Sequence, residues 1–255
     1  MSHHLKVRWA PRDEPLATCA GRLARMLERL EAVHPNLTHW RRKAKTRAAA
    51  YKPFCAMPPS LPELEGILLR GRHFASASKE LMPELGYSAA AWNGLDEPQS
   101  LSLRLSVGVY YERWLYPNDI RVDGLQAGNQ LVSATNLKRI LLAIAECWDA
   151  DWGVVDTWGY QGVRLDAEGR PLLPYGGWLT YLASAFAEKV APPPGVTTER
   201  TFDGGLFMLV SDEPFDVTNA THVGRLDAVQ KALAPVQRTL ASAFNRPSGS
   251  SGTAS

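Results

Sequence analysis

Hydrophobic and polar residues alternate at the start of the chain and then recur at helical spacing. Residues 5–9, LKVRW, place apolar and basic side chains in turn, which predicts a strand with one buried face. Residues 16–33 repeat apolar residues three or four positions apart, with arginine and glutamate on the other faces, which predicts an amphipathic helix. Asp13 is its expected N-cap, and His34-Pro35 is its expected end.

Two further helices are expected in the first third of the chain. Residues 39–50, HWRRKAKTRAAA, predict a second helix that starts near Thr38 and carries almost only positive charge. Three prolines between residues 53 and 59 mark a loop. Ser60 then caps a short predicted helix, LPELEGILLRG, in which leucine and isoleucine recur at helical spacing.

The middle of the chain changes to the period of a strand. Residues 86–95, 100–111 and 118–125 predict strands, with turns at Asn93-Gly94 and Pro117-Asn118. In the second of these segments, leucine and valine alternate with serine, arginine and glycine. One face is therefore apolar and the other polar, as in an antiparallel sheet.

The last part of the chain mixes both periods. Helices are expected at 133–148, with Ser133 or Thr135 as cap, at 184–191, and at 216–240 with a kink at Pro235. Strands are expected at 152–158, 176–183 and 205–211. We predict an α+β fold: a single domain over residues 1–246, with a mostly antiparallel sheet packed with amphipathic helices, and a disordered Ser/Gly-rich tail at 247–255.

Composition and charge narrow the class of protein. The chain has 255 residues, of which 45% are hydrophobic and 21% charged, and a net charge of +2. Such a charge indicates no general affinity for nucleic acid. No segment is typical of a signal peptide or a membrane span, and the three cysteines, Cys19, Cys55 and Cys147, favour a reducing compartment. We expect a cytoplasmic protein with no membrane partner.

The sequence lacks the common motifs of catalysis. It has no GxSxG elbow, no phosphate-binding glycine loop and no CxxC pair, so we predict no catalytic residue, no cofactor and no metal. The alternative is a metal-dependent nuclease or hydrolase that uses Asp149, Asp151 and Asp156. The favoured interpretation places Trp148 and Trp152 in the core at a helix-to-strand corner, where Asp149 and Asp151 solvate the turn.

A basic segment offers a second alternative, a nucleic-acid-binding module. Its cations could contact phosphate while Trp40 stacks on a base. The favoured interpretation is a solvated helix that pairs with nearby glutamates, because a nucleic-acid module usually carries a stronger net charge. The cations concerned are Arg41, Arg42, Lys43, Lys45 and Arg47.

An aromatic segment is the best candidate for contact with another protein. Residues 108–119, GVYYERWLYPND, end at a predicted turn, and aromatic residues with arginine at an exposed tip have the composition of a binding hot spot. Asp156 and Trp158 lie at the end of the predicted strand 152–158 and are expected to be exposed there. The predicted partner-binding residues are Tyr111, Arg113, Trp114, Tyr116, Asp156 and Trp158.

Seven short segments follow one another between residues 5 and 233. They are VRWAPRDEPLATCAGRLARMLERL, LEGILLRGR, LGYSAAAWNG, LSLRLSVG, ILLAIAECWDADWGVV, GGWLTYL and LVSDEPFDVTNATHVGRLDAVQKAL. This order resembles the immunity protein 52 family of bacterial polymorphic toxin systems. The segment from Tyr110 to Pro117 is longer and more aromatic than the family pattern.

The resemblance implies a function without chemistry of its own. An immunity protein of this family is expected to bind and neutralise a cognate toxin in the cytoplasm. The toxin is expected to be a type VI secretion effector with a restriction-endonuclease-like DNase domain, inhibited by masking of its active site or its DNA groove. No cofactor, direct nucleic-acid contact or membrane is implied, and the family supplies no binding residues for transfer to this chain.

Overall fold

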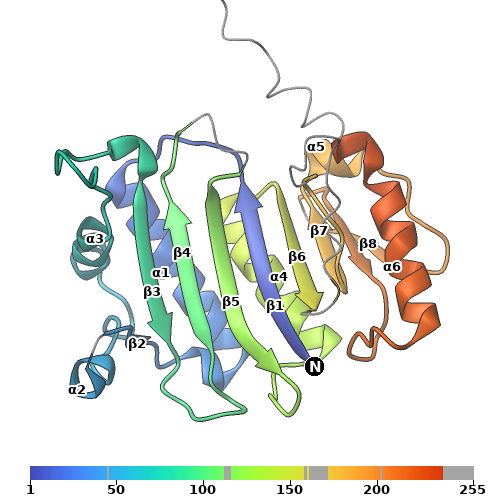
Figure 1. The fold of residues 1–255 in the computed structure, drawn as a ribbon, viewed down its shortest axis with the longest axis horizontal. Coiled ribbons are helices and arrows are strands. Elements are labelled where there is room, and N and C mark those ends of the chain that lie inside the picture. The colour runs from blue at the N-terminus through green and yellow to red at the C-terminus, as the bar shows by residue number, and fades with distance from the viewer. Residues whose placement is uncertain (45, 112–115, 158–159, 161–171, 202, 238–255) are drawn as a thin grey trace, which may run out of the picture.

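A nine-stranded antiparallel sheet organises the computed structural model, with α1 (Leu16–Val33) and α4 (Ala134–Trp148) behind it in the view of Figure 1. The structure describes residues 1–44, 46–111, 116–157, 160, 172–201 and 203–237. The strand order is β2-β3-β4-β5-β1-β6-β7-β9-β8. The strands are β1 (Ser2–Trp9), β2 (Arg41–Arg42), β3 (Tyr87–Trp92), β4 (Ser102–Val107), β5 (Asn118–Gln126), β6 (Trp152–Thr157), β7 (Leu179–Leu182), β8 (Thr197–Arg200) and β9 (Leu206–Leu209).

The helices confirm most of the expected pattern. The sequence periodicity placed α1, α3 (Leu61–Arg70) and α4 within a few residues of their observed positions, and α6 (Ala220–Ala232) covers part of the expected 216–240. The strands and helices together form the predicted α+β fold. Among the described residues, none of the helices has the length and apolarity that a membrane span requires. The helices are α1 (Leu16–Val33), α2 (Arg47–Ala50), α3 (Leu61–Arg70), α4 (Ala134–Trp148), α5 (Ser184–Ala187) and α6 (Ala220–Ala232), with 3₁₀ turns η1 (Pro35–Leu37) and η2 (Pro83–Leu85).

The first strand lies at the centre of the sheet. β1 pairs with β5 on one side and with β6 on the other, both antiparallel. The strands that follow it in sequence therefore divide into two groups, β2–β5 and β6–β9, on either side of β1 (Figure 1). Because a strand buried between two neighbours has no free edge, β1 joins the two halves of the chain into one sheet.

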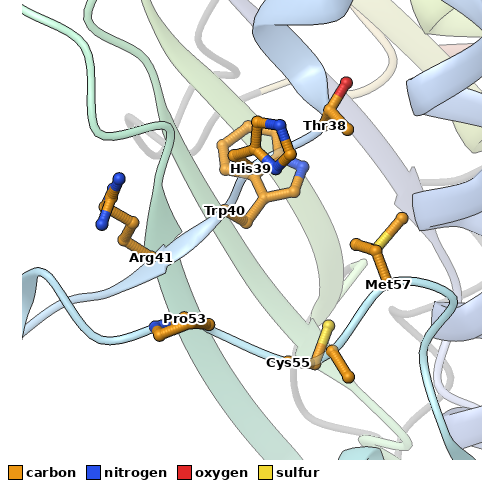
Figure 2. A pocket seen from close by; sticks show the side chains of 8 residues that line it. Thr38, His39, Trp40, Arg41, Pro53, Cys55 and Met57 are labelled. Atoms are coloured by element: carbon orange, nitrogen blue, oxygen red, sulfur yellow. The ribbon is translucent and has the colours of Figure 1, made fainter.

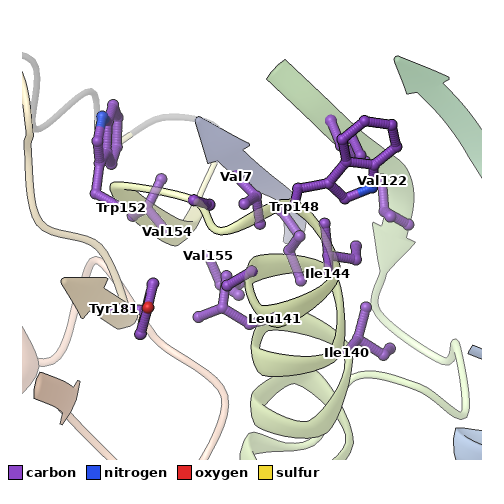
Figure 3. Packing of buried hydrophobic residues seen from close by; sticks show 14 of the residues in the cluster. Val7, Val122, Ile140, Leu141, Ile144, Trp148, Trp152, Val154, Val155 and Tyr181 are labelled. Atoms are coloured by element: carbon purple, nitrogen blue, oxygen red, sulfur yellow. The ribbon is translucent and has the colours of Figure 1, made fainter. Parts of the chain in front are cut away.

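The apolar side of β1 and the apolar stripe of α4 form the main core. Trp9 stacks on Trp148 with 5.2 Å between ring centroids. Figure 3 shows the side chains of Ile140, Leu141 and Ile144 on α4 beside those of the strands. Each of these aliphatic side chains is fully buried, and a buried side chain of this size stabilises the fold by roughly 1.5–3 kcal/mol.

The predicted corner between helix and strand is confirmed. Trp148 ends α4 and Trp152 begins β6, and both are 0% exposed. Between them, Asp149 adopts the left-handed conformation with φ of 44° and caps the helix. A short polar side chain tolerates this conformation better than a bulky one.

The helix predicted over residues 38–50 is wrong. Residues 41–42 form β2, which pairs with β3, and only Arg47–Ala50 is helical. Trp40 is buried, and its carbonyl accepts from the Phe54 amide at 2.8 Å, so the segment folds back on the proline-rich loop. Figure 2 shows the two segments facing each other. A basic sequence without an apolar stripe has no helix face to bury, so strand pairing prevails.

Smaller differences concern the ends of elements. Pro15, not Asp13, is the N-cap of α1. The last helix begins at Ala220, because the Asn219 side chain accepts from two amides of the first turn. The strand β8 was not predicted, since its sequence TTER has no apolar alternation. Residues 247–255 of the expected tail lie outside the described residues.

Candidate functional site

The three carboxylates of the alternative nuclease hypothesis serve separate structural roles. Asp149 pairs with Arg22 at 2.7 Å, and Asp151 accepts a hydrogen bond from the Ala10 amide at 2.7 Å. Asp156 lies within β6, where its side chain accepts from the Thr157 amide. In the described part of the chain, no three acidic, histidine or cysteine side chains gather closely enough to hold a metal ion. The nuclease alternative therefore lacks the convergent carboxylates that it requires.

Asp156 is buried, which contradicts the expectation that it is exposed at the strand end. It is 3% exposed, and its carboxylate lies 3.6 Å from the imidazole of His4 on the neighbouring strand. Burial raises the pKa of Asp156 to about 6, and burial followed by nearby cations lowers the pKa of His4 to about 4. At neutral pH the pair is a carboxylate beside a neutral imidazole. The physical reason for the burial is that β6 continues through Thr157 along β1, where Asp156 lies opposite His4.

The aromatic segment divides between core and surface. Tyr116 is 4% exposed and packs edge-on against Trp152 at 5.8 Å, so the expectation that it is exposed is wrong. Tyr111 is half-buried, and its amide donates to the carbonyl of Glu84. The other predicted contact residues, Arg113, Trp114 and Trp158, lie outside the described residues.

The basic segment borders an apolar hollow instead of forming a cationic groove. The hollow has a volume of about 270 Å³, and Trp40 lies in its wall (Figure 2). Arg41 donates to the Tyr51 carbonyl and Arg42 to the Pro53 carbonyl, so both guanidinium groups hold the local fold. A stacking tryptophan for nucleic acid would need an exposed ring, and Trp40 is 4% exposed. The hollow is lined by Thr38, His39, Trp40, Arg41, Pro53, Cys55, Ala56 and Met57.

A broad surface with charged side chains is the side of the sheet that faces away from α1 and α4 (Figure 1). We call it the open face: the side of β3, β4, β5 and β1 that no described helix covers in Figure 1. Side chains alternate across a strand, so Lys6 and Arg8 point away from the buried Leu5, Val7 and Trp9. The side chain of Arg104 on this face is 60% exposed.

The register brings cations from three strands together on the open face. Arg104 of β4 lies opposite Arg121 of β5, and Arg121 lies opposite Lys6 of β1. We call these three residues the basic row. Asp119 and Asp123 lie two residues before and after Arg121, so a carboxylate flanks the row on each side.

The sequence matches the family described as immunity protein 52 over residues 3–238. The chain belongs to the immunity protein 52 family. The resemblance inferred from the seven segments is thereby confirmed.

The immunity protein also has a similar solved structure. It is described as the Pseudomonas aeruginosa T6SS protein PA0821, with a TM-score of 0.52 and 12% sequence identity. The alignment covers 91% of this chain and 73% of that one, and at this identity it shows a shared fold only. No curated protein matches the chain.

The basic row was not identified from the sequence, although part of its signal was present. Alternation within residues 5–9 and 100–111 placed Lys6 and Arg104 on the polar faces of their strands. The missing information was the pairing of strands about 100 residues apart, which the local pattern does not contain.

Proposed function

We propose that this immunity protein binds the toxin encoded next to it and neutralises it in the cytoplasm. Membership of the immunity protein 52 family over residues 3–238 carries this proposal. The separate structural roles of Asp149, Asp151 and Asp156 support a binding function over a metal-dependent hydrolase. The similar structure described as a T6SS protein is compatible with a type VI secretion effector as the toxin.

The proposed toxin is a DNase with a restriction-endonuclease-like domain, inhibited by masking of its active site or DNA groove. The test is to purify the toxin's C-terminal domain with and without the immunity protein and to follow cleavage of plasmid DNA. A one-to-one complex and loss of cleavage at equimolar ratio are expected. A toxin that binds but cleaves no DNA would overturn the nuclease assignment alone. Cleavage of DNA by the purified immunity protein with magnesium would overturn the whole proposal.

We further propose that the aromatic segment contributes to the interface. Tyr111→Ala and Trp114→Ala are expected to raise the Kd for the toxin at least tenfold, because large aromatic side chains dominate most interfaces. Phe74→Ala is a matched control, since Phe74 is 52% exposed in a different loop and should leave the Kd within twofold. Binding is measured by calorimetry, and circular dichroism checks folding. Unchanged affinity in both variants would reject this segment. The proposed set also includes Arg113 and Trp158, whereas the buried Tyr116 and Asp156 are left out of it.

A further inference from the structure

The basic row places like charges opposite each other, which destabilises the protein in the absence of a partner. Like charges directly opposite each other on neighbouring strands are destabilising. Here the central cation, Arg121, has a cation opposite it on both sides, Arg104 and Lys6. Because neighbouring strands lie about 4.8 Å apart, the backbone positions of the three residues fall within about 10 Å across the sheet.

Ion pairs within the sheet compensate the two arginines of the row unequally. Arg121 pairs closely with Asp119. Arg104 lies 3.7 Å from Asp123, and its side chain is 60% exposed, so this pair is weak. The positive charge at the outer end of the row is therefore available to a partner.

The other end of the row, Lys6, lies in a net positive environment. Its ammonium donates to the hydroxyl of Tyr175 at 3.1 Å, which is a neutral acceptor. Burial lowers the pKa of Lys6, and Arg8 and Arg121 lower it further. The nearby carboxylates act in the opposite direction, but each acts more weakly than either arginine. The cations around Lys6 thus act on it more strongly than the carboxylates.

Arg8 is a further cation on the same side of β1, two residues after Lys6. Its guanidinium lies 5.8 Å from the Trp152 ring, and its Nε is buried with no hydrogen-bond partner in the part of the chain that the structure describes. Burial lowers its pKa, and Asp119, which lies opposite it in the register, is the carboxylate that acts against this. A buried donor without a partner is costly unless a ligand supplies an acceptor.

We propose that the open face is the surface that binds the toxin, and that the toxin places carboxylates against the basic row. This inference rests on the proposed function and adds the location and the chemistry of the contact. Carboxylates are the complement because each cation of the row then gains an opposite charge, which removes the repulsion between strands. Complementary charge of this kind mainly speeds association and selects the partner.

The flanking aspartates favour protein carboxylates over the phosphates of a nucleic acid. Asp119 and Asp123 lie on the same strand as the central arginine, on either side of the row. A phosphate backbone carries one charge after another along a continuous path, so a strand crossing the sheet would pass close to these carboxylates. A folded partner can place single carboxylates on the cations and leave the aspartates to its own cations or amides.

The test measures the Kd and association rate between the toxin domain and variants of the full immunity protein. Arg104→Glu is expected to raise the Kd at least tenfold and Lys6→Gln about threefold or more, mostly through slower association. Lys231→Glu is the matched control, since Lys231 is exposed on α6, and its Kd should stay within twofold. Exchange of one toxin carboxylate for lysine should restore binding to Arg104→Glu. A thermal melt of each variant verifies that it is folded, and Arg104→Gln replaces Arg104→Glu if the latter does not fold.

The outcomes separate the surface from the function. If the wild-type protein binds and inhibits the toxin while Arg104→Glu and Lys6→Gln match it, the open face is rejected and the proposed function stands. If the wild-type protein does not bind the toxin at all, both proposals fail. If the wild-type protein binds duplex DNA and the same substitutions abolish that binding, the row is a nucleic-acid site and the carboxylate proposal is overturned.

Discussion

At the scale of single residues, Asp156 is the group whose ionisation opposes folding most clearly. Its pKa rises from 3.8 to about 6 through burial, although the Thr157 amide and Lys6 act to lower it. A raised carboxyl pKa means that the folded state holds the proton more tightly than the unfolded state. The protonated group therefore favours folding below pH 4, and this contribution is lost as the pH rises through 6.

Asp156→Asn is expected to raise the free energy of unfolding by about 2–3 kcal/mol at pH 7.5, from the shift in pKa. Asparagine keeps the acceptor for the Thr157 amide and removes the buried charge. The gain should shrink towards zero near pH 4, where aspartate is protonated in both states. Urea unfolding of the two proteins at both pH values measures it. Asp212→Asn, at an exposed position, should have little effect at either pH, and an equal gain at both pH values for Asp156→Asn would contradict the assignment.

At the scale of the element, the two serines that precede helices differ in what their side chains do. Ser133 caps α4, and its hydroxyl accepts from the Asn136 amide at 3.2 Å. Ser60 occupies the same position before α3, but its side chain makes no capping hydrogen bond. The sequence predicted a cap at both positions, and only the structure distinguishes them.

Ser133→Ala is therefore expected to lower the free energy of unfolding by about 1 kcal/mol, the usual contribution of an N-cap. Ser60→Ala should lower the free energy of unfolding by only a few tenths of the loss expected for Ser133→Ala. Chemical denaturation of both variants under one set of conditions gives the comparison. An equal loss in the two variants would show that the hydroxyl of Ser133 does not act as a cap.

The same scale shows what the sequence could and could not predict. The helix 133–148 was predicted almost to the residue, because its apolar stripe and cap are local signals. The strand at residues 41–42 was missed because it forms only by pairing with β3, in which Arg41 lies opposite Trp92. β8 was missed because an exposed edge strand needs no apolar residues. Local patterns thus predict helices and strands that have an apolar face of their own. They do not predict strands whose formation depends on pairing with a distant strand.

The candidate site depends on register even more strongly. Alternation correctly predicted a polar face for residues 5–9 and 100–111. It could not show that Lys6 and Arg104 both lie beside Arg121, which requires the strand order β4-β5-β1. Burial of Tyr116 and Asp156 was likewise invisible, because their neighbours come from β6 and β1.

At the scale of the whole molecule, the sheet is asymmetric. Helices α1 and α4 lie against one side, while the open face keeps cations opposite one another (Figure 1). The net charge of +2 is too small to attract a partner over long distances. Recognition through charge must then come from local groups such as the basic row. A fold that retains destabilising charges at one location gives up some stability there, as functional surfaces commonly do.

Lys6→Gln tests whether the charge of Lys6 lowers the stability of the free protein while it supports binding to the toxin. The folded state disfavours the charged form of Lys6, because burial, Arg8 and Arg121 all lower its pKa. Glutamine removes the charge and keeps a polar side chain, so the free protein should gain roughly 0.2–1 kcal/mol in its free energy of unfolding. Urea unfolding at pH 7.5 without toxin measures the gain, with Lys231→Gln as the exposed control that should change little. A stabilised free protein that binds the toxin more weakly is the expected pair of results. A destabilised variant would mean that Lys6 supports the sheet instead of the interface.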